Sequence, residues 1–313
     1  MHLLPKPAEE EFALGYLGRL AHLNSAKSAN VLLRDLAKTF GVNARSANHL
    51  AIVAKAAGLS GTELLRAHTL TPAIVCGEDV VKGKLGKCSG YHRPNDNQNP
   101  MRLMRGSAYF CGDCVVGQRQ RHGFAYWHRV HQLPGIYWCP WHKNPLFYCD
   151  GRYITDKLPS WELPAKAPTS QVCKAIENPM LNRYNCVLMS FLYGAGPIDK
   201  LALYKLLAQA AKKKGINGWV QHANQPFLSD IAFDAIPEWW LQNYCPVSEK
   251  LPGKFFRAID DAIFEGGVGT QMYALAVAIL LEGDAPDISS ARRGEPIMCL
   301  DDEPSSPATQ QVQ

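Results

Sequence analysis

Two pairs of metal-binding side chains, each separated by two residues, limit what this chain can fold into more than any other feature of its sequence. The pairs are Cys111-Gly112-Asp113-Cys114 and Cys139-Pro140-Trp141-His142. A Cys-x-x-Cys turn can direct both sulfurs at one Zn²⁺ ion from about 2.3 Å, and a second such turn completes a tetrahedron. Gly112 and Pro140 favour tight turns. We therefore predict a structural zinc site whose ligands are Cys111, Cys114, Cys139 and His142.

Three thiolates and one imidazole fill the tetrahedral shell of a zinc ion, so this site leaves no open position for water or substrate. Two simpler interpretations compete with it: ordinary buried cysteines, or a redox pair. A second metal site around Cys88 and His92, or around His128 and His131, is also left open. The remaining candidate ligands in this part of the chain are His122 and Cys149.

The overall composition indicates a globular protein rather than a membrane or secreted one. The chain has 313 residues, of which 47% are hydrophobic and 19% charged, which suffices for two or three modest domains or one large one. No apolar run approaches the roughly 18 residues that span a bilayer, and the first residues lack a secretory signal. We expect a cytoplasmic location, in which ten cysteines serve as metal ligands or buried thiols rather than disulfides.

Basic residues are concentrated in the middle of the chain. Between Val81 and His131, nine basic residues face two acidic ones, whereas residues 282–303 carry seven acidic and two basic ones. The middle segment can therefore face a polyanion that the acidic segment would repel. Five arginines near the predicted zinc site are the candidate nucleic-acid contacts: Arg102, Arg105, Arg119, Arg121 and Arg129.

Helical periodicity makes the predicted fold mainly α. Residues 1–75 contain short apolar stripes at helical spacing, and Ser60-Gly61-Thr62-Glu63 is a capping-box pattern. The turn in Leu36-Ala37-x-x-x-Gly41-Val42 suits a helix-turn-helix, although a plain helical bundle uses the same turns. Asn43 is a candidate cap for the helix that follows this turn.

The second half of the chain is also predicted to be helical. Asp199 is placed to cap a helix that ends at Lys212-Lys213-Lys214-Gly215, and residues 272–281 form a strongly apolar helix. We therefore predict four parts: a helical N-terminal domain over 1–75, a basic connector and zinc module over 76–150, a helical C-terminal domain over 168–282, and an acidic, disordered tail over 283–313.

The motifs around the predicted zinc ligands resemble the TniQ family. The resemblance is carried by Tyr109-Phe110-Cys111-Gly112-Asp113-Cys114, by the segments 122–129 and 131–135, and by Cys139-Pro140-Trp141-His142-Lys143-Asn144-Pro145-Leu146. The opening of the chain, Leu4-Pro5-x-Pro7 and Tyr16-Leu17-x-Arg19-Leu20-Ala21, is also similar to that family. The resemblance covers residues 1 to about 150.

The resemblance implies a role in choosing the target of a DNA transposition machine. Members of the TniQ family mark the insertion site, by reading DNA or by docking onto a CRISPR guide-RNA complex, and then recruit an AAA+ ATPase and the transposase. By position, the four predicted ligands would bind zinc. Trp127, Arg129, Gln132 and Pro134 would pack and orient the module.

Our leading hypothesis is therefore a zinc-stabilised, non-enzymatic target-selection adaptor of a bacterial mobile element, associated with the nucleoid when it binds DNA. Its expected partners are DNA and an AAA+ ATPase, with a guide-RNA complex and a second copy of the chain left open. The alternative is a free-standing zinc and helix-turn-helix DNA-binding regulator. A nuclease built on His128, His131 and Asp113 is disfavoured, because no open metal position or carboxylate cluster is visible.

Overall fold

The computed structural model describes residues 2–42, 49–76, 101, 103–160, 162–194, 196–217, 225–264, 268–281, 283 and 287–292. These residues are mainly helical, which confirms the helical character that the sequence predicted. Within these ranges no helix has the length and apolar character needed to cross a membrane. Four groups of sequence-based predictions lie outside them: Asn43, most of the basic connector with Cys88 and His92, Arg102, and most of the acidic tail.

The N-terminal part is a bundle of four short helices that bury one continuous core. The helices are α1 (Ala13–Leu23), α2 (Ala29–Thr39), α3 (His49–Ala57) and α4 (Gly61–His68), followed by the 3-10 helix η1 (Thr71–Ala73). The predicted capping box is present, because Ser60 accepts from the Glu63 N–H and Glu63 accepts from the Ser60 N–H. Leu23, the last residue of α1, is 42% exposed.

The helix-turn-helix stays a prediction, because residues 43–48 between α2 and α3 are not among the described residues. The connection between α3 and α4 is a short turn at Gly58 and Leu59. Gly58 adopts φ +67°, a left-handed conformation that glycine reaches without steric cost. Among the described residues, α2 ends at Thr39 beside the predicted turn at Gly41, and α4 begins after its predicted cap Ser60.

The zinc module contains two strands that the sequence analysis did not predict. β2 (Ser107–Phe110) and β3 (Phe147–Asp150) pair in antiparallel fashion, with Ser107 opposite Asp150 and Phe110 opposite Phe147. Four residues each are too few for a readable alternation, and no hairpin turn joins them. Between them lie α6 (Gly112–His122) and the 3-10 helix η2 (Val130–Gln132), and α7 (Tyr153–Asp156) follows β3.

The C-terminal part consists of helices packed around α14. In chain order these elements are α8 (Ser170–Ala175), α9 (Pro179–Tyr193), β4 (Ile198–Asp199), α10 (Lys200–Lys213), α11 (Leu228–Ala235), α12 (Glu238–Leu241), η3 (Val247–Glu249), α13 (Arg257–Asp260), η4 (Asp261–Ile263), α14 (Thr270–Leu280) and η5 (Ser289–Ala291). Two predictions are confirmed. Asp199 caps α10 by accepting from the Ala202 N–H at 2.7 Å, and residues 272–280 of α14 are buried.

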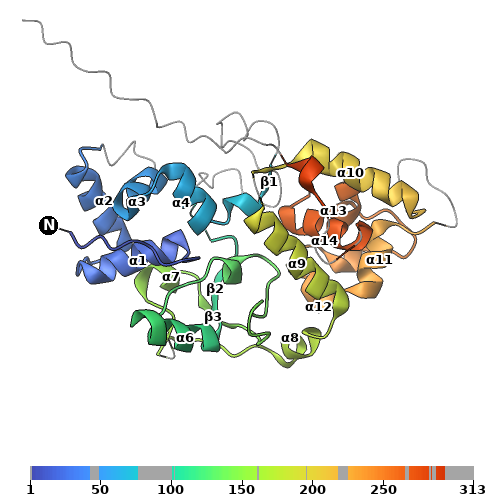
Figure 1. The fold of residues 1–313 in the computed structure, drawn as a ribbon. Helices are drawn as coiled ribbons and strands as arrows, with labels where there is room; N and C mark the ends of the chain where they lie inside the picture. The colour runs from blue at the N-terminus through green and yellow to red at the C-terminus, as the bar shows by residue number, and fades with distance from the viewer. Residues whose placement is uncertain are drawn as a thin grey trace, which may run out of the picture.

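Three groups of elements are distinguishable in space (Figure 1). The bundle lies on one side, the C-terminal helices lie on the other with α9 facing the middle, and the zinc module lies against both. A short parallel pairing of β1 (Val75–Cys76) with β4 links the end of the bundle to the C-terminal part. Gly18 of α1 meets α7 so closely that a Cβ there would lie 2.7 Å from the Thr155 carbonyl oxygen.

Buried apolar residues form two clusters that do not coincide with the three groups. One cluster belongs to the bundle, from Ala13 to Leu65, together with Met101. The other runs without a break from the zinc module into the C-terminal helices. Where the zinc module meets the C-terminal helices, the Tyr184 hydroxyl donates to the Pro134 carbonyl at 2.9 Å. The module and the C-terminal helices thus share one core, and the predicted boundaries between parts stay predictions.

Candidate metal centre

The four predicted ligands converge on one point. Their ligand atoms all lie within 4.8 Å of one another, although the two pairs come from separate segments. Cys111 directly precedes α6, and Cys114 stands in its first turn. Cys139 and His142 flank a tight turn that ends at Lys143, whose φ of +57° is in the left-handed region.

Four of the six distances between these atoms match those of a tetrahedral zinc shell. The Cys114 and Cys139 sulfurs are 3.7 Å apart, and the three sulfurs lie 3.4–3.5 Å from His142 Nδ1. Zinc bonds of about 2.3 Å to sulfur and about 2.0 Å to nitrogen at tetrahedral angles give about 3.8 Å between sulfurs and about 3.6 Å from sulfur to nitrogen. The donor set therefore fits Zn²⁺ in both chemistry and spacing.

Hydrogen bonds among the three neighbouring thiols shift their pKa values in opposite directions. Hydrogen bonds from Cys114 and Cys139 hold the pKa of the Cys111 thiol far below its ordinary value. The hydrogen bond to Cys111 raises the pKa of Cys114 far above its ordinary range and is the main cause that raises that of Cys139 to about 11. Without a cation, the three thiols cannot all ionise at neutral pH. Zinc would bind here by displacing protons, and its affinity would therefore fall as the pH falls.

Hydrogen bonds outside the ligand shell tie the two ligand turns together. The Asn144 side chain donates to the Asp113 carboxylate at 2.5 Å, which links the second turn to the first. Within the second turn, the Lys143 N–H donates to the Cys139 carbonyl at 2.9 Å. Sequence reasoning assigned no role to Asn144, because only the tertiary structure brings it to Asp113.

The other candidate ligands do not join this shell. Cys149 is buried in β3, and His122 is exposed at the end of α6. His128 and His131 pack against the Trp141 ring, with centroids 4.9 and 5.8 Å away. Burial lowers the pKa of His128 to about 4 and that of His131 well below its ordinary value, so both are neutral. Across the described ranges, no second group of three potential metal ligands is found, and Cys88 and His92 lie outside those ranges.

The five candidate arginines occupy three kinds of environment. Arg119 and Arg121 are exposed in the last turn of α6. Arg105 is partly buried: its guanidinium lies 3.4 Å from the Tyr109 ring centroid and donates to the Ile136 carbonyl at 2.6 Å. Arg129 is 3% exposed. Arg102 is outside the described residues.

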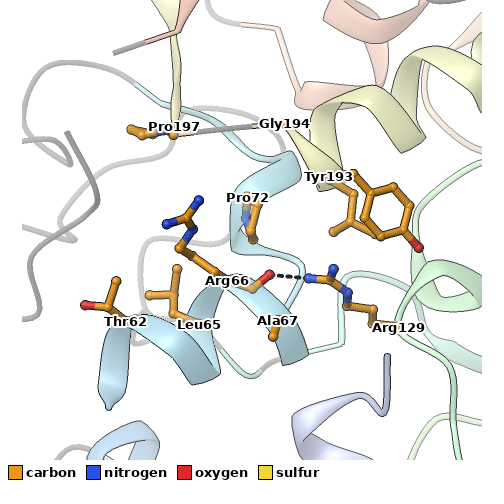
Figure 2. A pocket seen from close by; sticks show the side chains of 11 residues that line it. Thr62, Leu65, Arg66, Ala67, Pro72, Arg129, Tyr193, Gly194 and Pro197 are labelled. Atoms are coloured by element: carbon orange, nitrogen blue, oxygen red, sulfur yellow. Dashed lines mark hydrogen bonds between the residues drawn. The ribbon is translucent and has the colours of Figure 1, made fainter. Parts of the chain in front are cut away.

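Arg129 joins all three parts of the protein. Its guanidinium forms two hydrogen bonds of 2.8 Å to the Glu10 carboxylate and a third to the Arg66 carbonyl in α4, as Figure 2 shows. The Tyr193 hydroxyl at the end of α9 donates to the same Glu10 carboxylate at 2.9 Å. Glu10 itself adopts φ +61°, in the left-handed region. The Arg129 side chain is thus fully engaged inside the protein, and sequence reasoning missed its partner Glu10.

The residues that the resemblance assigned to packing are buried. Trp127 is fully buried and donates through Nε1 to the Lys157 carbonyl at 2.8 Å. Gln132 pairs with the Tyr109 backbone through both ends of its amide, at 3.0 and 2.8 Å. Pro134 is buried at the junction with α9. These contacts hold the segment between the two ligand pairs in place.

The match to known families falls on the part of the chain just described. The TniQ family model matches residues 2–146, which span the bundle and both ligand pairs. These residues are therefore similar to the TniQ family, and the similarity associates this part of the chain with DNA transposition. No match to a curated protein was found. The helices from α7 onward lie outside the matched TniQ region.

Proposed function

We propose that this chain is a zinc-stabilised, non-enzymatic adaptor that marks the insertion site in DNA transposition and recruits an AAA+ ATPase and the transposase. The observation that carries this proposal is the TniQ match, which includes all four candidate zinc ligands. A cytoplasmic, nucleoid-associated location is part of the same proposal. The structural role of zinc is supported by the closed Cys₃His shell, because such shells stabilise folds rather than catalyse reactions.

The proposed DNA contact is the exposed end of α6. Arg119 and Arg121 lie in its last turn, close in sequence to the zinc ligand Cys114. Among the residues that the structure describes, neither side chain has an ion-pair partner. Both guanidinium groups are therefore available to phosphates, whereas Arg105 and Arg129 are engaged in the interior.

The proposed absence of catalysis is supported by the residues that a nuclease would need. Asp113 accepts a hydrogen bond from Asn144, and His131 is 1% exposed. A hydrolytic metal site also requires an open coordination position, which the Cys₃His shell does not offer. Cleavage of DNA by the zinc-loaded chain, lost in His128→Ala, would contradict this part of the proposal.

The DNA contact is tested by binding to a labelled duplex over a series of salt concentrations. Each neutralised phosphate contributes about −0.9 to the slope of log affinity against log salt. Arg119→Ala/Arg121→Ala should therefore make the slope shallower by about 1.8. Lys212→Ala/Lys213→Ala, which removes two exposed cations from α10, is the matched control. Equal slopes for the wild type and the arginine variant would place the contact elsewhere.

The mode of target choice is tested with DNA from the insertion site and scrambled DNA. A preference of about tenfold, or about 1.4 kcal/mol, would make the chain a direct reader of the site. Equal affinities would mean that another complex supplies the address. Co-purification with the AAA+ ATPase of the same element tests recruitment, and failure to bind it would favour a free-standing regulator.

A further inference from the structure

A second feature of the zinc module is a pocket beside the ligand His142. It has a volume of about 390 Å³ and lies between the N-terminal arm, α6 and the second ligand turn. The residues that matter for its chemistry are Glu9, Gln118, Arg121, His128, Trp141 and His142. Its volume falls in the range of pockets that take small-molecule ligands.

One wall of this pocket is an exposed tryptophan. Trp141 is 47% exposed, yet its ring is held by the neighbouring rings of His128 and His131. Because Trp141 directly precedes His142, a bound metal would fix its backbone as well. A large, ordered aromatic face open to solvent beside basic side chains is a surface on which a nucleobase can stack.

Another wall carries hydrogen-bonding groups without partners. Gln118 is only 6% exposed, and its Oε1 accepts from the Tyr126 N–H at 2.9 Å, which fixes the orientation of the amide. Its Nε2 has no hydrogen-bond partner, and neither has His128 Nδ1. Buried polar groups are almost always satisfied, so these two atoms mark a place where a ligand can supply the missing partner.

The rim of the pocket carries both signs of charge. Arg121 is an exposed cation that suits a phosphate, whereas Glu9 is an exposed carboxylate that suits an amino or N–H group. Two further carboxylates line the pocket but are already engaged: Glu10 pairs with Arg129, and Asp113 accepts a hydrogen bond from Asn144. The pocket adjoins the candidate metal centre through Cys114 and His142, and the described residues hold no second group of three potential metal ligands. The set fits a ligand with a planar ring, mixed hydrogen-bonding edges and one negative charge.

We propose that this pocket binds one unpaired nucleotide of DNA. Its base stacks on Trp141, its edge meets the Gln118 amide and the Glu9 carboxylate, and its phosphate meets Arg121. The proposal rests on the DNA contact of α6 proposed above. It adds that the zinc module favours DNA with an unstacked base over an intact duplex.

The test compares two labelled duplexes of the same sequence, one fully paired and one with a single extrahelical 2-aminopurine. The full-length, zinc-loaded chain should bind the bulged duplex at least about fivefold more tightly, since stacking on an aromatic side chain contributes roughly five- to hundredfold per base. The 2-aminopurine fluorescence should change on binding, because its stacking partner changes from neighbouring bases to an indole ring.

Variants separate this pocket from the general DNA contact. Trp141→Ala and Gln118→Leu should each reduce the preference for the bulged duplex and leave the affinity for the paired duplex within twofold. Trp141→Phe should retain part of the preference. Arg119→Ala should lower both affinities by the same factor. Phe255→Ala, at another exposed aromatic in the C-terminal part, should change neither affinity. Zinc content and helical circular dichroism together verify that each variant is folded.

The outcomes distinguish the two proposals. Equal wild-type affinities for the two duplexes, with the Arg119 and Arg121 effects intact, would overturn the nucleotide pocket and leave the DNA contact standing. A bulge preference that survives both Trp141→Ala and Gln118→Leu would also overturn it. Binding that shows no dependence on salt or on Arg119 and Arg121 would instead contradict the proposed function.

Discussion

In the N-terminal bundle, four helices of 8 to 11 residues bury leucine and alanine side chains against one another. In the zinc module, two four-residue strands, one helix and long irregular segments surround four candidate ligands. In the bundle, most backbone N–H and C=O groups form their hydrogen bonds within helices. In the module, several backbone groups form hydrogen bonds with side chains instead. The Gln132 amide bonds the Tyr109 backbone, and the Arg105 guanidinium donates to the Ile136 carbonyl.

The two parts are therefore expected to be stabilised by different interactions, the bundle by its apolar core and the module by its metal ligands. Removing one core residue from the bundle leaves the rest of a continuous apolar cluster. Removing one candidate ligand from the module would open the proposed zinc shell. In small fingers such a shell binds zinc with a free energy of about 10–16 kcal/mol, similar to or greater than the roughly 5–15 kcal/mol stability of a whole domain. We therefore expect the module to be all-or-none with respect to metal and the bundle to respond gradually.

The largest effect is expected from Cys139→Ala. This variant should lose zinc and unfold residues 107–150, because three remaining ligands cannot close the shell. The measurements are zinc content and hydrogen exchange of peptides from the module. Cys245→Ala, which removes a buried cysteine of the C-terminal part, is the control and should keep its zinc. Full zinc content with wild-type exchange in Cys139→Ala would show that the cluster is not a structural site.

The next largest effect is expected in the bundle. Leu36 is completely buried in α2, and Leu36→Ala should cost about 2–5 kcal/mol of unfolding free energy through lost burial and a cavity. Chemical denaturation followed by helical circular dichroism measures it, with Leu23→Ala at a 42% exposed position as the matched control. Zinc content should stay unchanged. Loss of zinc in Leu36→Ala would mean that the bundle and the module unfold as one unit.

A smaller effect is expected at the start of α4. Ser60→Ala removes the hydroxyl that accepts from the Glu63 N–H and should cost about 1 kcal/mol. Thermal unfolding of this variant is compared with that of Ser248→Ala, at an exposed serine in η3. If the two variants unfold at the same temperature, the capping box contributes nothing measurable to the bundle.

The smallest effect is expected from His68, which donates through Nδ1 to the Glu11 carbonyl at 2.8 Å. Burial lowers the pKa of His68 in the folded state, so the unfolded chain, with an ordinary pKa of about 6.5, takes up the proton first. The stability that His68 contributes is therefore complete above about pH 6.5 and is lost as the pH falls toward the lower folded pKa.

This pH dependence is measured by denaturation at about pH 7.5 and about pH 5.5, on either side of the ordinary histidine pKa. The wild type should lose more stability between these values than His68→Gln does, and the difference between the two chains isolates His68 from the pH dependence of zinc binding. A larger loss in His68→Gln would reverse the sign that burial predicts.

Much of the bundle could be predicted from the sequence because its signals are local. The Ser60–Glu63 capping box, the cap at Asp199 and the apolar run of α14 each involve residues that are close in the sequence. The strands β2 and β3 could not be predicted in this way. Their four-residue lengths carry little periodicity, and their aromatic pairs, such as Tyr109 with Tyr148 and Phe110 with Phe147, form only after the module has folded.

The sequence alone determined the identity of the four candidate ligands, because two residues between the members of each pair suffice to turn both toward one ion. It also determined the helical character of the described residues from 13 to 68 and of most described elements between residues 170 and 280. Only the tertiary structure decided which arginines face solvent. Arg119, Arg121 and Arg129 have the same side chain and lie in one basic segment, and they differ only in the residues that pack around them. Arg129 forms a partly buried ion pair with Glu10, which lies 119 residues away in the chain. Long-range contacts of this kind depend on how the segments pack, and no local pattern contains them.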